Sequence, residues 1–547
     1  MRGRRFAWLL LLAAVCSLPT AGQSRPDSAD DDPVLRAMKV ELDRSMEKLR
    51  LEHFQAPYYI EYSVVEQDQF TANAAFGAVR GRVRARVRTL RAVVRVGDYK
   101  QDSYEGAGQG RVDLMPQDDD LLALRHQLWL ATDAAYKQAL EALTAKQARL
   151  KQLEVETPVD DFARAPALKA IRPLARLEVD ENRWVGLLES LSSLYREAPD
   201  VQFLEATLRF SATNRYLVNS EGTLTRQGNA VYAVFVTGST QAPDGMRLER
   251  TPGFVAPRME ELPTPEELKT SARKVLDDLK ALRAAPVVEE EYRGPVLLSS
   301  GVTAAAFLDL VAPNLLGRKP APGSPARTTG AYASSFKNRV LPEFLSVVDD
   351  PTEMKYGDRS LVGTYAVDDE GVRAQSVTAV EKGELVSYLM SRQPIRDFPA
   401  SNGHARANGP APPAPAISNL FVRSSKTVPR EELKKKLIEL CSQRSLPYGY
   451  SVDNVTGRLQ PALVYRIWVK DGREELVRGA VFGELDTRAL RNDIIAVGDD
   501  PKAHNRSAAL PESVIAPSLL FDDLQIRRSS ATQQKLPVYP PPPEGGD

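Results

Sequence analysis

The residues of this chain that could bind a metal ion or activate water are few and widely spaced. The sequence contains two cysteines and four histidines, His53, His126, His404 and His504. A zinc peptidase commonly places two histidines on one helix face and adds a carboxylate or bound water to activate the attack. These histidines have no such spacing among themselves. Each alone is more typical of a surface or hydrogen-bonded residue than of a metal ligand.

Two groups of neighbouring acids could serve acid–base chemistry. Residues 368–371 read Asp-Asp-Glu-Gly between two predicted strands, and residues 349–351 read Asp-Asp-Pro. Paired carboxylates can transfer protons, but acids beside glycine or proline are also typical of solvated turns. We predict solvated turns at both places. The chain has no GxSxG, Walker or dinucleotide-binding sequence.

Length and composition bound the architecture. The chain has 547 residues, is 43% hydrophobic, and carries 72 basic and 72 acidic residues. A chain of this length exceeds a single hydrophobic core, so we expect two or more domains. The balanced charge provides no strong field for nucleic acid. The composition therefore indicates a globular protein that does not bind nucleic acid.

The N-terminus has the order of a secretory signal peptide over residues 1–22. Three arginines precede an apolar run at residues 6–18, and small residues follow at 20–22. The run is shorter than the roughly 20 residues that a membrane span needs. We therefore predict export to a periplasmic or extracellular location, with no transmembrane span after signal removal. Cys16 would permit a lipid anchor, but Val15 is a poor match to a lipoprotein cleavage site, so soluble export is favoured.

Signal removal would leave Cys441 as the only cysteine. No internal disulfide is then expected, and the fold must depend on its hydrophobic cores. Cys441 lies on the apolar face of a predicted helix over residues 431–441. We interpret it as a small core residue rather than a nucleophile.

Residues 33–285 are predicted to form an N-terminal α+β domain with a mainly antiparallel sheet. Helical spacing of apolar residues predicts helices over 35–49, 118–157, 182–195 and 263–282. Alternating patterns predict strands over 58–64, 80–96, 203–210, 215–219 and 230–237. A short turn at residues 219–222 joins two of these strands.

Arginines occupy every second position from 80 to 88, on one face of a predicted strand. Beyond Thr89 the even positions are apolar and Arg91 and Arg95 stand at odd positions, which predicts a turn or bulge near Thr89. The stripe could bind carboxylates, phosphates or anionic lipid. Because it lacks interleaved aromatic residues, a charged outer face that discourages edge pairing is favoured.

Residues 294–528 are predicted to form a β-rich C-terminal domain, after a boundary within residues 283–294. Strand-like runs occur at 296–299, 360–367, 374–381, 464–470 and 474–481. Residues 529–547 include four consecutive prolines and are predicted to be a disordered or polyproline tail. The expected fold class is α+β, in two domains.

Several segments of the C-terminal half resemble the C-terminal domain of the TldD/PmbA family of zinc peptidases. They are GTYAVDDEGVRAQSVTAVEKGELVSYLMSR from residue 363, SNGHARANGP from 401, ISNLFVRS from 417, VLPEFLSVVDDPT from 340 and SVIAPSLLFDDLQI from 513. The resemblance is strong beyond residue 296 and weak before it. It implies an N-terminal α/β domain, here with a helical insertion at about 118–200, and a β-rich C-terminal domain.

The resemblance also implies where a zinc site would stand. The TldD branch carries HExxxH on a helix and a distant cysteine. Aligned on the helix that follows strand 296–299, Leu308 and Pro313 replace the two histidines and Asp309 replaces the glutamate. The expected cysteine region, residues 497–515, contains no cysteine, and its only histidine is His504. Neither leucine nor proline can bind a metal, so no cofactor is expected at this site.

A loop of the same resemblance implies contacts with substrate. Residues 401–406 resemble a family loop near the peptide cleft, which lies between the protomers of a dimer. Asn402, His404 and Arg406 are therefore candidate substrate-binding residues. The competing interpretation is a loop that only folds around its glycines.

Three hypotheses follow for the function. The first is a non-catalytic subunit that binds extended or unfolded peptide, as a homodimer or as a heterodimer with a metal-bearing family member. The second is an active zinc metallopeptidase whose ligands have moved, with His404 and His504 as candidates beside Asp309 or Glu343. The third is an envelope protein retained for assembly alone, without affinity for peptides.

Overall fold

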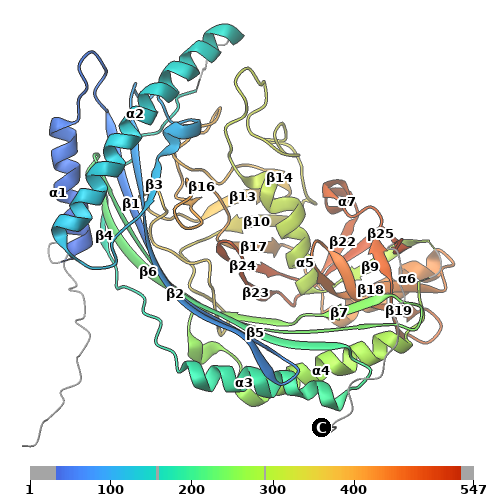
Figure 1. The fold of residues 1–547 in the computed structure, drawn as a ribbon. Helices are drawn as coiled ribbons and strands as arrows, with labels where there is room; N and C mark the ends of the chain where they lie inside the picture. Colours follow the sequence, from blue (N-terminus) through green and yellow to red (C-terminus); the bar gives the residue numbers. More distant parts are fainter. Residues whose placement is uncertain (1–31, 155–158, 289–290, 531–547) are drawn as a thin grey trace, which may run out of the picture.

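The computed structural model describes residues 32–154, 159–288 and 291–530 of the chain. The predicted signal peptide, Cys16 and the tail from residue 531 lie outside the described residues. The described chain is α+β, with helices against a long N-terminal sheet and a β-rich C-terminal part (Figure 1). The predicted fold class is confirmed. None of the helices in the described ranges is long and apolar enough to span a membrane.

Long antiparallel strands form the centre of the N-terminal sheet, in the order β2-β1-β5-β6. They are β1 (Tyr59–Ala75), β2 (Ala78–Arg95), β5 (Phe203–Asn219) and β6 (Leu224–Gln241). Shorter strands extend its two sides: β3 (Arg111–Leu114) beside β2, and β4 (Lys169–Ile171), β7 (Arg247–Arg250) and β8 (Gly253–Ala256) beside β6. Three short strands predicted over 203–237 are thus parts of two long ones.

The four helices of the N-terminal domain cover one face of this sheet (Figure 1). They are α1 (Pro33–Lys48), α2 (Leu121–Leu153), α3 (Glu181–Ser193) and α4 (Pro265–Ala284). The covered face carries the even-numbered residues, because alternate side chains of a strand point to opposite faces. Helices α1 and α2 pack on one half, around Tyr62, and α3 and α4 pack on the other, around Phe210. The odd-numbered face turns toward the C-terminal domain.

Strand β2 corrects the prediction of a bulge near Thr89. Its pairing with β1 is regular through Thr89, and the irregularity lies at Asn73 and Ala74 near the hairpin tip. The even face of β2 is continuous: its arginines lie toward one end and its apolar residues toward the other. Four of the five arginines from position 80 to 88 pair with carboxylates, for example Arg84 with Asp68 at 2.7 Å and Arg88 with Glu66. The change in pattern reflects a change in what covers the strand rather than a change of phase.

The C-terminal part contains two sheets around one large apolar core. The first sheet has the order β14-β13-β10-β17-β24-β23: Glu384–Leu385, Val377–Glu381, Leu345–Asp349, Asn419–Ser424, Pro511–Ala516 and Lys502–Ser507. The second has the order β20 (Glu474–Val477), β19 (Gln460–Trp468), β18 (Tyr448–Thr456), β9 (Tyr292–Leu298), β25 (Leu519–Arg528) and β21 (Ala480–Phe482). Strand β22 (Ile494–Val497) also pairs with β25. Short pairs also form between β11 (Lys355–Tyr356) and β12 (Arg359–Ser360), and between β15 (Ala405–Arg406) and β16 (Ala414–Pro415). The helices are α5 (Ser300–Ala306), α6 (Arg430–Gln443) and α7 (Thr487–Asn492).

One predicted strand of this domain is wrong. Of residues 360–367, only Ser360 pairs in a strand, with Lys355. Irregular contacts hold the rest of this segment: the Val362 N–H donates to Ser513 Oγ at 3.0 Å, and the Tyr365 N–H donates to the Pro351 carbonyl at 3.0 Å. The segment is therefore an ordered loop.

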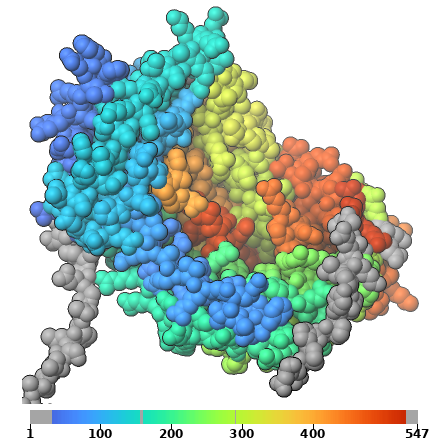
Figure 2. Space-filling model, viewed as in Figure 1, coloured from blue at the N-terminus to red at the C-terminus, as the bar shows by residue number. Residues whose placement is uncertain are grey.

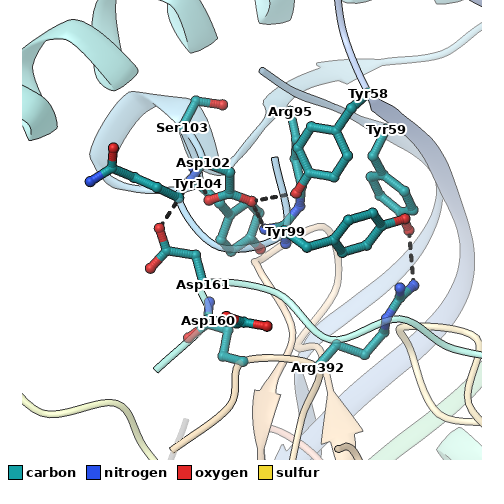
Figure 3. A network of polar contacts seen from close by, with 12 residues as sticks. Tyr58, Tyr59, Arg95, Tyr99, Asp102, Ser103, Tyr104, Asp160, Asp161 and Arg392 are labelled. Carbon is teal, nitrogen blue, oxygen red and sulfur yellow. Dashed lines mark hydrogen bonds and ion pairs between the residues drawn. The ribbon is translucent and has the colours of Figure 1, made fainter. Parts of the chain in front are cut away.

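A buried guanidinium, that of Arg392, joins the two domains. It donates to the Ala163 carbonyl through Nε at 2.9 Å and Nη2 at 2.7 Å, and it pairs with Glu221 at 2.6 Å. Its Nη1 also donates to the Tyr59 hydroxyl at 3.4 Å (Figure 3). The carbon of the guanidinium lies 4.0 Å from the ring centroid of Phe162. One side chain of the C-terminal domain thus contacts three separate segments of the N-terminal domain.

A second buried arginine supports the same contact from the sheet. Arg95 lies 3.7 Å from the Phe162 ring centroid and pairs with Asp102 at 2.7 Å (Figure 3). The Asp102 carboxylate also accepts from the Tyr58 hydroxyl at 2.8 Å. Phe162 therefore has a guanidinium from each domain within cation–π distance.

We predict that Arg392→Met lowers the free energy of unfolding by about 3–5 kcal/mol, because it leaves Glu221 and Glu370 without their buried counter-charge. Urea unfolding followed by circular dichroism measures this loss. Arg396→Met is the matched control, because that exposed arginine donates only to the Pro325 carbonyl. Equal effects of the two substitutions would contradict the assigned role of Arg392.

Candidate functional site

A cavity of about 760 Å³ lies between the N-terminal sheet and the C-terminal domain. The space-filling view shows orange and red segments of the C-terminal domain beside the blue N-terminal sheet (Figure 2). Strand β6, the loop at 361–369 and the segment at 172–175 form its walls. Its polar lining includes Arg172, Arg215, Gln227, Asn229, Thr364, Tyr365, Asp368, Asp369, Arg373 and Arg406.

Within this cavity the outer edge of β6 is open. The β4 strand pairs with β6 up to Arg226, and β8 pairs with it from Tyr232 onward. In the described part of the chain no strand pairs with residues 227–231 on that side. Five residues correspond to about 17 Å of strand at about 3.4 Å each. The cavity therefore exposes a short stretch of unpaired sheet edge.

The hydrogen-bond pattern of β6 identifies the residues whose backbone N–H and C=O groups lie at its open edge. The Asn219 N–H donates to the Thr223 carbonyl at 3.1 Å, and the Arg172 N–H donates to the Arg226 carbonyl at 2.7 Å. Because backbone groups alternate along a strand, odd-numbered residues face β5 and even-numbered residues face the open edge. Gly228 and Ala230 thus direct their N–H and C=O groups into the cavity.

Proline and glycine explain why the edge opens. The Arg172 carbonyl accepts from the Arg226 Nε at 3.2 Å, and the fixed backbone of Pro173 follows, so the pairing that β4 begins ends at Arg172. The chain then packs against Gly228, where a Cβ atom would come within 2.2 Å of the Ala175 nitrogen. Asn214 holds Ala175 there through hydrogen bonds of 2.8 and 3.1 Å. This segment therefore leaves the edge and lies beside it.

The neighbouring acids at residues 349–350 and 368–370 are not in the solvated turns that their sequence predicted. Asp368 and Glu370 are each 4% exposed, and Asp349 and Asp350 are also buried. The predicted solvated turns are therefore wrong at both places. Backbone N–H groups take the place of water: Asp368 accepts from Glu370 and Val372 through one oxygen and from Ala405 through the other. Burial raises the pKa of Asp368 and of Glu370, and backbone amides oppose both shifts.

The predicted substrate loop divides between the cavity and the interior. Arg406 lines the cavity; its Nη1 donates to the Ile417 carbonyl at 2.7 Å and its guanidinium lies 5.3 Å from the Tyr365 ring centroid. Asn402 instead bonds the Met390 N–H and the Tyr388 carbonyl, which shapes the loop. The structure thus brings Arg406 alone of the predicted three to the cavity wall.

His404 is fully buried behind the cavity. Its Nε2 lies 3.2 Å from Asp349 Oδ1, and its Nδ1 lies 3.0 Å from Asn402 Oδ1. The same Asp349 carboxylate accepts from the Ser418 N–H and hydroxyl. Both ring nitrogens therefore contact oxygen atoms of the protein.

His504 lies in β23 and contacts a different element. Its Nε2 is 2.7 Å from the hydroxyl of Ser300, at the start of α5. Burial lowers the pKa of His504 to about 4, and the positive charges of Arg359 and Lys502 act in the same direction. A neutral imidazole beside a serine could act as a base, but Ser300 is buried and does not line the cavity.

The structure does not bring His404 and His504 together. Asp349, which contacts His404, is in register with Leu420 of β17, then Val514 of β24, then His504 of β23. Three strand spacings of about 4.8 Å place the two ends about 14 Å apart. Zinc ligands lie only about 2 Å from the ion, so one ion does not reach both rings from this arrangement.

The positions aligned with the zinc motif do not offer ligands. Helix α5 continues as a wider π turn at Phe307–Val311 and a 3-10 turn at Ala312–Leu315. Leu308 is part of the main apolar core, whereas Asp309 and Pro313 are exposed. In the described ranges no three His, Cys, Asp or Glu side chains converge as a metal site. Because leucine and proline have no donor atom for a metal, the residues at positions 308 and 313 do not fit zinc.

Cys441 and Glu512 complete the account of reactive groups. Cys441 is fully buried among apolar residues of α6 and neighbouring strands, which confirms the predicted core role. Glu512 adjoins the cavity residue Pro511; burial raises its pKa, and Arg506 lies 3.8 Å away. The sequence carried no signal for Glu512, because a single acid in a strand has no distinguishing spacing.

Comparisons with known proteins connect this structure to a family. Residues 291–528 match the family model of the PmbA/TldA metallopeptidase C-terminal domain. A metalloprotease of Archaeoglobus fulgidus is 34% identical over 84 residues, which are 15% of this chain and 18% of that protein. Metalloprotease MJ0996 of Methanocaldococcus jannaschii is 28% identical over 154 residues, 26% of this chain and 30% of that protein. The chain thus matches less than a third of the length of these relatives.

Solved structures share the fold across both domains. A candidate modulator of DNA gyrase from Thermotoga maritima has a TM-score of 0.61 at 15% identity, covering 90% of this chain and 99% of that one. TldE from Thermococcus kodakarensis has a TM-score of 0.60 at 13% identity, with the same coverage. At these identities the likeness concerns the fold alone.

We predict that the free energy of unfolding falls as the pH is lowered from about 6.5 to about 4, by at most about 3 kcal/mol from His504. In that window the unfolded chain binds a proton that the folded protein does not. Urea unfolding at several pH values should show a smaller decline for His504→Gln. The control His126→Gln replaces an exposed histidine and should leave the fall in the free energy of unfolding with pH unchanged. Identical pH profiles for His504→Gln and the unsubstituted protein would contradict this prediction.

Proposed function

Because the chain belongs to the TldD/PmbA family, we propose that it is an exported, non-catalytic member of that family that binds extended peptides. The membership rests on the domain match at residues 291–528, the metalloprotease relatives and the fold shared with TldE. The proposal adds three properties to this membership: peptide binding, export and the absence of hydrolysis.

The open edge of β6 inside the cavity carries the peptide proposal. An extended peptide can add to a sheet edge and gain main-chain hydrogen bonds, while alternate side chains enter neighbouring pockets. Gly228 and Ala230 offer the required N–H and C=O groups. Apolar wall residues, among them Met354 and Val362, offer contacts for side chains. An unfolded segment can meet these requirements, whereas a folded domain has no free strand to insert.

The side chains at the zinc positions support the absence of hydrolysis. Leu308 packs in the core and Pro313 has no donor atom for a metal. We propose that a metal-bearing family member supplies hydrolysis in a heterodimer, and that the present chain holds the peptide. Export rests on the charged, apolar and small-residue order of residues 1–22, which lie outside the described part.

We predict that the mature protein, purified without chelators from zinc-supplied cells, contains far less than one zinc ion per chain. It should not hydrolyse an unstructured peptide. Elemental analysis and a peptide-cleavage assay measure these two quantities. Stoichiometric zinc with chelator-sensitive cleavage would instead favour relocated ligands, and His404→Ala and His504→Ala would then identify them.

We also predict that Ala230→Pro weakens binding of an unstructured peptide by about tenfold or more. Proline removes the N–H that faces the open edge, while the bonds to β5 come from odd-numbered residues and persist. The matched control Ala230→Val keeps that N–H. Fluorescence anisotropy with a labelled peptide measures affinity, and a thermal melt verifies that both variants fold. Unchanged affinity in a folded Ala230→Pro protein would refute strand addition at this edge.

A further inference from the structure

The cavity wall carries more positive charge than its acids neutralise. Four arginines and two aspartates line it. Arg215 uses one aspartate, since its Nε lies 3.1 Å from Asp369 Oδ1 and its Nη2 donates to the Ala407 carbonyl at 3.2 Å. The other aspartate, Asp368, is buried and its carboxyl oxygens accept backbone N–H groups. Neither acid is available to the remaining arginines.

Two of these arginines have no acidic partner. Arg172 and Arg373 are exposed at the cavity, and neither forms an ion pair with any residue in the described ranges. Arg406 makes one bond to a carbonyl and contacts the Tyr365 ring. Arg406 acts electrostatically on Glu512, a carboxyl whose pKa is raised by burial. Three guanidinium groups therefore remain to attract an anion.

The backbone fixes these arginines beside the open edge. Arg172 is the last residue before the gap, and it exchanges hydrogen bonds with Arg226: its N–H donates at 2.7 Å and its carbonyl accepts from Arg226 Nε at 3.2 Å. Arg373 lies in a hairpin closed by the Ala374 N–H donating to the Ala366 carbonyl at 3.0 Å. Arg406 belongs to β15, whose Ala405 N–H bonds to Asp368. All three guanidinium groups thus extend from anchored backbone.

We propose that this cavity recognises a carboxylate of the extended peptide through Arg172, Arg373 and Arg406. This inference rests on the proposed function and names its ligand class. Planar guanidinium groups bind carboxylates through paired, charge-assisted hydrogen bonds. The carboxylate can come from the C-terminus of the peptide or from an Asp or Glu side chain. The shared chemistry is an extended backbone beside a carboxylate.

The test uses the full mature chain and four peptides of one apolar, unstructured sequence, labelled at the N-terminus. One has a free C-terminal carboxylate and one a C-terminal amide; the other two are amidated and carry either a central Glu or a central Gln. Anisotropy titrations at about 0.15 M salt give the affinities. We expect about tenfold tighter binding for at least one acid over its neutral match. The pair that shows the difference identifies the source of the carboxylate.

The double substitution Arg172→Gln and Arg373→Gln tests the assignment. It should reduce the ratio of the affinity for the acidic peptide to that for its neutral match to below about threefold. Arg176→Gln is the control, since that exposed arginine does not line the cavity. Equal binding of acidic and neutral peptides would refute carboxylate recognition while leaving the proposed function intact. Failure of every peptide to bind would refute both.

Discussion

The relation between the two domains depends on a charge buried where they meet. Arg392 has no water around it, so carbonyls, carboxylates and aromatic rings of the N-terminal domain must supply its partners. Removing such a group from its partners is costly, which favours a single arrangement of the domains. The cavity requires that arrangement, because one wall comes from β6 and the opposite wall from the loop at 361–369.

The two faces of the long sheet have different tasks. Its even-numbered face is apolar along most of its length and is covered by helices, which gives the N-terminal domain its core. Its odd-numbered face holds buried ions such as Arg91 and Arg95 and meets the C-terminal domain. The site is built on the second face. The fold thus obtains stability from one side of the sheet and leaves the other for polar contacts.

Regular patterns predicted much of this architecture. The helices at α1, α3, α4 and α6, strand β2 and parts of the other long strands follow from spacing that depends only on local geometry. The buried acids at 349–350 and 368–370 could not be predicted in that way, because the N–H groups that replace water come from distant residues such as Ala405 and Ser418. The open edge of β6 could not be predicted for the same reason, because it depends on where the pairing of β6 with β4 and β8 ends.

The zinc positions show how a motif and a fold can separate. Of the two positions aligned with the zinc motif, Leu308 packs in the main apolar core and Pro313 follows a π turn. The fold around these positions is similar to that of TldE from Thermococcus kodakarensis. The likeness therefore concerns the scaffold of sheets, whereas the side chains of Leu308 and Pro313 have no donor atom for a metal.

Strand β2 limits how this protein can change in length. Arg88 lies on the even face and Arg91 on the odd face, and each has its own buried carboxylate, Glu66 and Glu61. Inserting one residue between these arginines would turn every later side chain of the strand to the opposite face. Arg95 would then face the helices, and apolar residues such as Val94 would face the buried ions. Tolerated insertions in this strand should therefore add residues in pairs or form a bulge, so the hairpin tip is the natural place for length variation among relatives.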